Sequence, residues 1–176
     1  FARDPRYNGL QTRKVKVSAN VSCLFTADKI AEKSVDELDE ALRAAFDFDN
    51  FAWQEQNHIV INENFRADGL NRILYKCAHC GAEGQMEGSG TRLVCHACGK
   101  SYELTPLGTL AAESGETEFA HIPDWYKWER QCVREEIENG SYRLDVPVKI
   151  GIVVDFKAVY MVGEGRLVHT AEGFRL

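Results

Sequence analysis

The spacing of apolar residues predicts several helices in the first half of the chain. After Ser34, apolar residues recur every three or four positions with acidic residues between them, the pattern of a helix with one apolar face. Ser34 and Glu37 have the spacing of a capping box, in which each side chain accepts a hydrogen bond from the other residue's backbone amide. Shorter helices are expected over residues 26–33, 51–57 and 67–73. The apolar face of the main helix consists of Val35, Leu38, Leu42, Ala45 and Phe46.

Strict alternation of apolar and polar residues predicts β-strands near the C-terminal end. Residues 158–162 and 166–170 flank a Gly-Glu-Gly sequence at 163–165, which is typical of a three-residue hairpin turn. Residues 171–173 give a second turn signal, so any strand after them is short. A similar alternation over residues 15–21 predicts a strand near the beginning. The clearest alternation involves Val146, Val148, Ile150, Ile152 and Val154.

A further amphipathic helix is expected between a predicted loop at residues 106–121 and these strands. Pro123 can occupy its first turn and Gly140 can end it. The aromatic residues in it could stack on a ligand, but helical spacing beside a cysteine is more typical of core packing. Cys132 and Cys23 are both interpreted as small buried hydrophobic residues. The aromatic residues are Trp125, Tyr126 and Trp128, and the apolar stripe comprises Trp125, Trp128, Cys132 and Ile137.

The strongest chemical signal is a pair of CxxCG sequences separated by a short glycine-rich stretch. Zinc favours four soft donors in a tetrahedron, and each CxxC turn supplies two. A glycine after the second cysteine permits a positive-φ turn that brings backbone amides towards the sulfurs. Strands at residues 74–76 and 92–94 are expected to bring the two knuckles together. The predicted zinc ligands are Cys77, Cys80, Cys95 and Cys98.

Two other interpretations of this module are less well supported. His79 and His96 lie within the knuckles and could replace a cysteine, but four thiolates already complete a tetrahedral shell. Redox chemistry by a CxxC pair usually requires a strand-to-helix setting, whereas both pairs here are followed by glycine. A closed four-thiolate shell has no open position for a substrate. The zinc is therefore expected to be structural, with no catalytic residue in the module.

Together these patterns predict an α+β fold with a small helical N-terminal part, a four-cysteine zinc ribbon, and then a helix and an antiparallel β-sheet. Residues 1–72 would form a basic strand and an acidic helical segment. Residues 73–105 would form the zinc ribbon. Residues 106–176 would contain the loop, the amphipathic helix and an antiparallel β module.

Composition narrows the functional classes. The 176 residues carry a net charge of −6, and residues 75–104 are neutral overall, which argues against nucleic acid as a partner because phosphate binding needs a basic surface. No apolar run reaches the ~20 residues that span a bilayer. Few cysteines and no visible signal peptide favour a reducing, cytoplasmic location. Since the sequence begins with Phe1 and not Met, we expect it to be part of a longer protein.

Charge is unevenly distributed along the first third of the chain. Residues 1–17 carry a net charge of +4, whereas residues 26–69 contain eleven acidic and four basic residues. The acidic surface is most simply a solvated helical face, with a docking face for a basic partner as the alternative. The basic segment is most simply an exposed strand end or linker. Contact with an anionic membrane surface is the alternative for it.

The order of several short sequences resembles the C-terminal region of bacterial 1-acyl-sn-glycerol-3-phosphate acyltransferases of the phospholipid/glycerol acyltransferase family. The resemblance extends over nearly the whole chain and includes the knuckles. It implies an upstream catalytic domain as partner, lysophosphatidic acid acyl transfer in phospholipid synthesis by the parent enzyme, and an association of that parent with the cytoplasmic face of a membrane. The matching sequences lie at residues 12–17, 24–26, 34–38, 53–57, 69–75, 124–129 and 163–167.

The chain lacks the catalytic motifs of the family that it resembles. The family uses a His-x4-Asp motif, in which the aspartate orients the histidine as general base, and a phosphate-binding Pro-Glu-Gly type motif. Neither is present, since none of the five histidines has Asp five residues later. The resemblance therefore implies a non-catalytic region with a structural or regulatory role. The alternative is a stand-alone zinc-ribbon adaptor that binds protein or, less favoured, nucleic acid. The five histidines are His58, His79, His96, His121 and His169.

Overall fold

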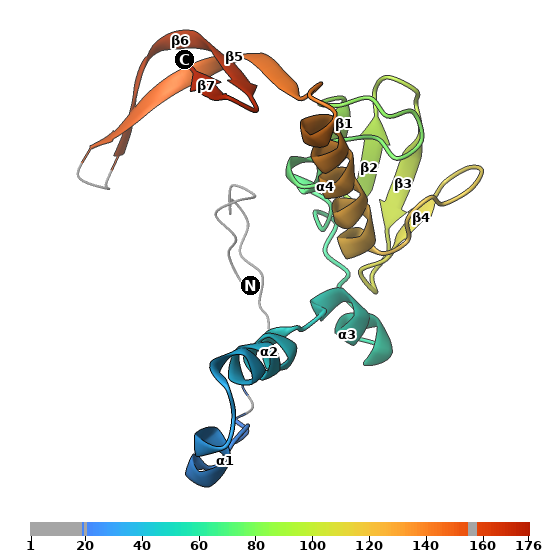
Figure 1. The fold of residues 1–176 in the computed structure, drawn as a ribbon. Helices are drawn as coiled ribbons and strands as arrows, with labels where there is room; N and C mark the ends of the chain where they lie inside the picture. The colour runs from blue at the N-terminus through green and yellow to red at the C-terminus, as the bar shows by residue number, and fades with distance from the viewer. Residues whose placement is uncertain (1–18, 20, 155–157) are drawn as a thin grey trace. The chain divides into compact units, whose positions relative to one another are not determined.

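A computed structural model describes residue 19, residues 21–154 and residues 158–176. The described residues contain α-helices and two antiparallel sheets, which confirms the predicted α+β class (Figure 1). The chain divides into two compact units, Phe1–Tyr126 and Lys127–Leu176. The three-part division at residues 72 and 105 stays a prediction. Most of the strand expected at residues 15–21 lies outside the described residues, and residues 19 and 21 have no regular structure.

The helices of the N-terminal part begin where polar side chains can satisfy free backbone amides. They are α1 (Ala27–Ala31), α2 (Val35–Phe46) and α3 (Asn50–Gln56). The capping box of α2 is confirmed, because Ser34 N donates to Glu37 Oε2 at 2.8 Å and Glu37 N donates to Ser34 Oγ at 3.3 Å. Asp49 caps α3 by accepting from two backbone amides. The helix expected over residues 67–73 is wrong, since only the short 3₁₀ helix η2 (Leu70–Arg72) forms there.

The first unit contains a four-stranded antiparallel sheet in the order β1-β2-β3-β4. Only the second of these strands was expected, and the strand predicted at residues 74–76 is reduced to an isolated bridge between Lys76 and Glu83. The loop predicted for residues 106–121 contains the last strand. Strands of three or four residues are too short for alternation to reveal them. They are β1 (Met86–Ser89), β2 (Arg92–Cys95), β3 (Ser101–Leu104) and β4 (Leu110–Ala112).

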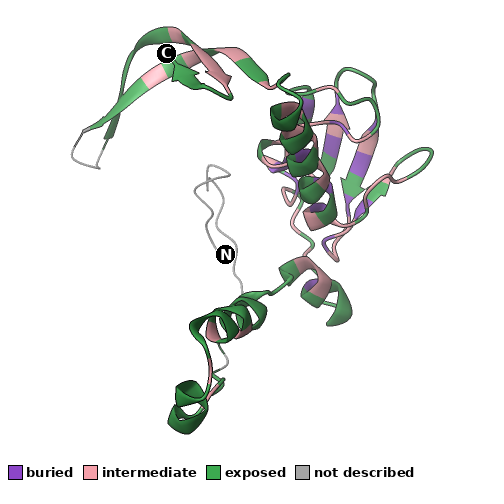
Figure 2. Cartoon of the chain, viewed as in Figure 1, coloured by how far each residue is buried: buried purple, intermediate pink, exposed green. Residues whose placement is uncertain are grey.

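The core of the first unit lies against this sheet, where Figure 2 shows the buried residues gathered. Trp125, in the first turn of α4 (Ile122–Glu138), is fully buried and meets the Tyr102 ring edge-on, with ring centroids 5.0 Å apart. The prediction that Trp125 belongs to the core is thus confirmed. For its neighbour Tyr126 the same prediction is wrong, because the Tyr126 side chain is exposed. Leu74, Leu93 and Leu110 complete the apolar centre of this unit.

A segment around η2 covers the open edge of β1. Ala67 N donates to Gly90 O at 2.9 Å, and Gly69 N donates to Gly88 O at 3.0 Å. The approach is so close that a Cβ on Gly88 would lie 2.4 Å from Ala67 O. Glycine at position 88 is therefore required for this segment to lie along the strand. Covering an edge in this way also prevents it from pairing with another chain.

The second unit contains a three-stranded antiparallel sheet, β5 (Arg143–Val154), β6 (Ala158–Thr170) and β7 (Gly173–Arg175), in that order. The strand predicted from the alternation at 146–154 is confirmed. The hairpin turn predicted at residues 163–165 is wrong, because β6 runs through it while pairing with β5. Neither Gly163 nor Gly165 has a positive φ. The short strand expected after residues 171–173 is present as β7.

Candidate metal centre

Each CxxCG sequence forms a tight turn stabilised by its own backbone. Gly81 N donates to Cys77 O at 2.9 Å, and Gly99 N donates to Cys95 O at 2.8 Å. Gly81 and Gly99 have φ values of 74° and 75°, the left-handed region that glycine adopts without strain. The two knuckles therefore have the same local conformation. The second is attached to the end of β2, while Met86 at the start of β1 pairs with Cys95.

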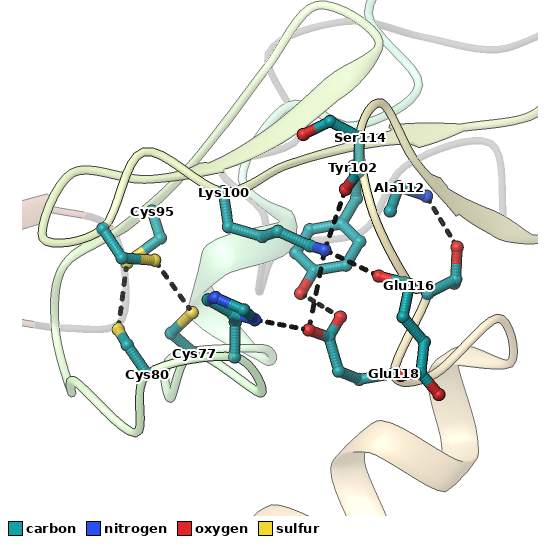
Figure 3. A network of polar contacts seen from close by, with 12 residues as sticks. Cys77, Cys80, Cys95, Lys100, Tyr102, Ala112, Ser114, Glu116 and Glu118 are labelled. Atoms are coloured by element: carbon teal, nitrogen blue, oxygen red, sulfur yellow. Dashed lines mark hydrogen bonds and ion pairs between the residues drawn. The ribbon is translucent and has the colours of Figure 1, made fainter.

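The fold brings the four predicted cysteines together. One sulfur atom from each of Cys77, Cys80, Cys95 and Cys98 lies within 4.8 Å of all the others. Two separations between the knuckles are 3.8 Å, one joining Cys77 to Cys98 and the other joining Cys80 to Cys95 (Figure 3). A tetrahedral ion with metal–sulfur bonds of about 2.3 Å requires sulfur separations of about 3.8 Å. The cluster therefore has the dimensions of a four-thiolate site and could hold a metal ion.

The surroundings of Cys77, Cys80 and Cys98 change the pKa of their thiols. Burial raises the pKa of the Cys77 thiol to about 12, whereas the backbone amide of Ala82 is the main cause that lowers the pKa of Cys80 to about 7. Burial also raises the pKa of Cys98, opposed by the Lys100 amide. A metal ion binds thiolates and competes with protons for them. Metal binding at this cluster is consequently expected to release protons and to weaken as the pH falls.

The two knuckle histidines face carboxylates. His79 Nδ1 lies 2.8 Å from Glu118 Oε1, and His96 Nε2 lies 2.6 Å from Glu87 Oε2. Neither belongs to the group that could hold a metal ion. The donor set is therefore four sulfurs, and the histidines connect the knuckles to the rest of the unit.

Next to the second knuckle lies a polar network that had not been predicted from the sequence (Figure 3). The Lys100 side chain is only 8% exposed, and its Nζ donates to Ser114 O at 3.0 Å and to Glu116 O at 2.6 Å. Tyr102 Oη donates to Glu118 Oε2 at 2.6 Å. Burial alone would raise the pKa of Glu118, but the hydrogen bond from Tyr102, helped by His79 and Lys100, lowers it overall. The network holds the loop after β4 against the knuckle, and no local sequence pattern signals it.

The two remaining cysteines, Cys23 and Cys132, lie outside the cluster, and so does His121. Cys23 is exposed, so its interpretation as a buried hydrophobic residue is wrong: in the part of the chain that the structure describes, residues 21–25 belong to no strand. Cys132 is partly buried. His121 contacts Asp49 Oδ2 at 2.9 Å and Asp124 Oδ2 at 3.1 Å, which connects the cap of α3 to the first turn of α4.

Comparisons with known proteins leave the module to be interpreted from its own geometry. No protein-family model, curated protein or solved structure in these comparisons matches the chain. Across the part of the chain that the structure describes, no helix is both long enough and apolar enough to cross a membrane. The fold and the cluster define this chain as an α+β protein with a four-cysteine module suited to a metal ion.

Proposed function

We propose that the chain binds one zinc ion through Cys77, Cys80, Cys95 and Cys98, and that this ion stabilises the fold of the surrounding ribbon. The observation that carries the proposal is the separation of 3.8 Å between sulfurs of different knuckles, the value a tetrahedral four-thiolate ion needs. Four sulfur donors suit zinc or iron. Zinc is the metal proposed here because paired CxxCG turns are typical of structural zinc ribbons.

The role of the ion is structural. Four thiolates complete the tetrahedron, so no position remains for water or substrate. The strands of the ribbon contain only three or four residues each, and segments of this size rarely form a sufficient core without a staple. Zinc binding would supply part of the free energy that holds these strands together.

We propose that the parent protein is a phospholipid/glycerol acyltransferase and that this chain is a non-catalytic accessory region of it. The support is the order of the short sequences that resemble that family, together with the absence of its His-x4-Asp motif from this chain. Its partner would be the upstream catalytic domain, in a parent working at the cytoplasmic face of a membrane. An anionic membrane surface would meet the basic residues 1–17.

A zinc-ribbon adaptor that binds another protein is the second candidate. It is favoured by exposed apolar residues on α2, where Val35 is 73% and Phe46 is 81% exposed. An exposed apolar helix face is typical of a surface that docks another protein. The sequence upstream of Phe1 distinguishes the two candidates, since a His-x4-Asp motif supports the acyltransferase and its absence supports the adaptor.

Elemental analysis tests the metal proposal directly. Protein purified without chelators should contain about one equivalent of zinc, as expected for a single tetrahedral site. A zinc content below about a tenth of an equivalent, or iron in its place with the colour of an iron–thiolate site, would contradict it.

A further inference from the structure

The four sulfurs of the cluster differ sharply in their access to solvent. Cys77 and Cys95, the first cysteines of the two knuckles, are fully buried. Cys80 and Cys98, the second cysteines, are exposed. The cluster therefore has a protected pair and an accessible pair, with one member of each pair in each knuckle. A reagent in solution meets the accessible pair first.

Zinc ligation would keep all four sulfurs in the thiolate form, which is the form that reacts with oxidants. Oxidation of cysteine depends on both thiolate character and exposure. Cys77 and Cys95 have only the first property, whereas Cys80 and Cys98 have both. A second thiolate is also close to each exposed sulfur: Cys95 lies 3.8 Å from Cys80, and Cys77 lies 3.8 Å from Cys98.

We propose that Cys80 and Cys98 are sites of oxidation by hydroperoxides, and that their oxidation releases the metal from the cluster. This inference rests on the zinc site proposed above. It adds a modification site to a module that would otherwise be purely structural. The oxidant is a small hydroperoxide, such as hydrogen peroxide.

The chemistry balances with the peroxide as the oxidant. The exposed thiolate attacks one peroxide oxygen, an S–O bond forms, the O–O bond breaks, and hydroxide leaves with a sulfenic acid on the cysteine. A neighbouring thiolate then attacks that sulfur, an S–S bond forms, the S–O bond breaks, and a second hydroxide leaves. Two thiolates are oxidised by two electrons in total, and one peroxide is reduced to two hydroxides. The two thiolates that remain cannot complete a tetrahedron, so the ion is lost.

The experiment treats the zinc-loaded chain with hydrogen peroxide and follows free zinc with a chromogenic chelator. A parallel sample contains dimedone, which traps sulfenic acids, and mass spectrometry then locates the adducts and the disulfides. We expect adducts on Cys80 and Cys98, a disulfide that includes at least one of them, and loss of the bound zinc. The Cys23→Ser variant removes the exposed cysteine outside the cluster and should release zinc like the unchanged chain.

A double variant, Cys80→His with Cys98→His, replaces the accessible thiolates with imidazoles that can still bind zinc. It should keep its zinc at peroxide concentrations that empty the unchanged site. If it does not load zinc, the adduct map on the unchanged chain still decides the question.

Three results would overturn the inference while leaving the zinc site intact. The first is dimedone adducts on Cys77 or Cys95 in place of the exposed pair. The second is a disulfide between those two buried cysteines. The third is zinc that stays bound to the unchanged chain at peroxide concentrations that fully oxidise the exposed Cys23. Zinc release from the double histidine variant at the rate of the unchanged chain would do the same. Protein that contains no zinc before peroxide is added would instead contradict the proposed function itself.

Discussion

The indole Nε1 of Trp125 donates a hydrogen bond of 3.0 Å to the backbone oxygen of Lys76, the residue directly before Cys77. This bond connects the first turn of α4 to the entrance of the first knuckle across 49 positions of sequence. The same ring packs edge-on against Tyr102. The Tyr102 hydroxyl donates a hydrogen bond to Glu118, and the Glu118 carboxylate also contacts His79 of the first knuckle. Trp125 is therefore both a core residue and a support for the metal centre.

Replacing Trp125 with Phe should keep most of the packing and remove this hydrogen bond. We expect the free energy of unfolding to fall by about 1 kcal/mol, the usual net value of one hydrogen bond, and by more if the smaller ring leaves a cavity. Urea unfolding at saturating zinc measures the change. Trp53→Phe is the matched control, because it makes the same change at an exposed tryptophan. Equal stability of the Trp125 and Trp53 variants would contradict the supporting role.

Replacing Cys95 with Ser should remove zinc and unfold the ribbon. Structural zinc contributes on the order of 10 kcal/mol in small zinc peptides, and a serine hydroxyl is a poor substitute for a thiolate. Zinc content and thermal unfolding measure the effect, with Cys23→Ser as the control because Cys23 lies outside the cluster. A Cys95 variant with unchanged zinc content and melting temperature would show that the assignment of the ligands is wrong.

Replacing Gly88 with Ala should loosen the segment that covers β1. A Cβ there would lie 2.4 Å from Ala67 O and 2.8 Å from Leu70 N, so the covering segment has to move. Over-packing of this kind typically costs about 1–3 kcal/mol. Gly163→Ala is the control, since a Cβ at Gly163 meets nothing within 4 Å and its φ is not positive. Chemical unfolding compares the two, and equal stability would contradict the close approach.

The capping box of α2 should depend on pH. Hydrogen bonds from the backbone and hydroxyl of Ser34, with the charge of Lys33, lower the pKa of Glu37 from its usual value of 4.5. A carboxyl whose pKa is lower in the folded chain stabilises the fold above its unfolded pKa, and this contribution is lost as the pH falls through the folded pKa. Carboxyl NMR should show Glu37 titrating below 4.5, and Ser34→Ala should move it upwards. The variant keeps the backbone donor of residue 34, so an unchanged pKa would show that the Ser34 hydroxyl does not interact with the Glu37 carboxylate.

The features that could be predicted from the sequence are those encoded by residues close together in the chain. The cysteine cluster follows from two local turns, and the cap of α2 follows from residues three positions apart. The Gly-Glu-Gly sequence at 163–165 misled the prediction, because a glycine pair is compatible with either a turn or an extended strand. Pairing with β5 decides for the strand here.

Features set by contacts between distant residues could not be predicted. Lys100 reaches backbone oxygens 14 and 16 residues away, and Trp125 reaches Lys76 across 49 residues. The exposure of Cys23 is a similar case. An apolar residue in an alternating stretch is buried only if another part of the chain packs against the face on which it lies, and local sequence does not show which parts meet.

The isolated chain should have no acyltransferase activity. Acyl transfer to a glycerol hydroxyl needs a positioned base and groups that stabilise the developing oxyanion. The family that the sequence resembles uses a histidine held by an aspartate five residues later, and no histidine here has that neighbour. His121 does contact Asp49 and Asp124, so it is the residue to check first. The assay combines the purified chain with lysophosphatidic acid and with an acyl donor, either acyl-CoA or acylated acyl carrier protein. We expect no turnover above background. Turnover that disappears in a His121→Ala variant, with the fold intact by circular dichroism, would overturn the prediction and the view of this chain as a non-catalytic region.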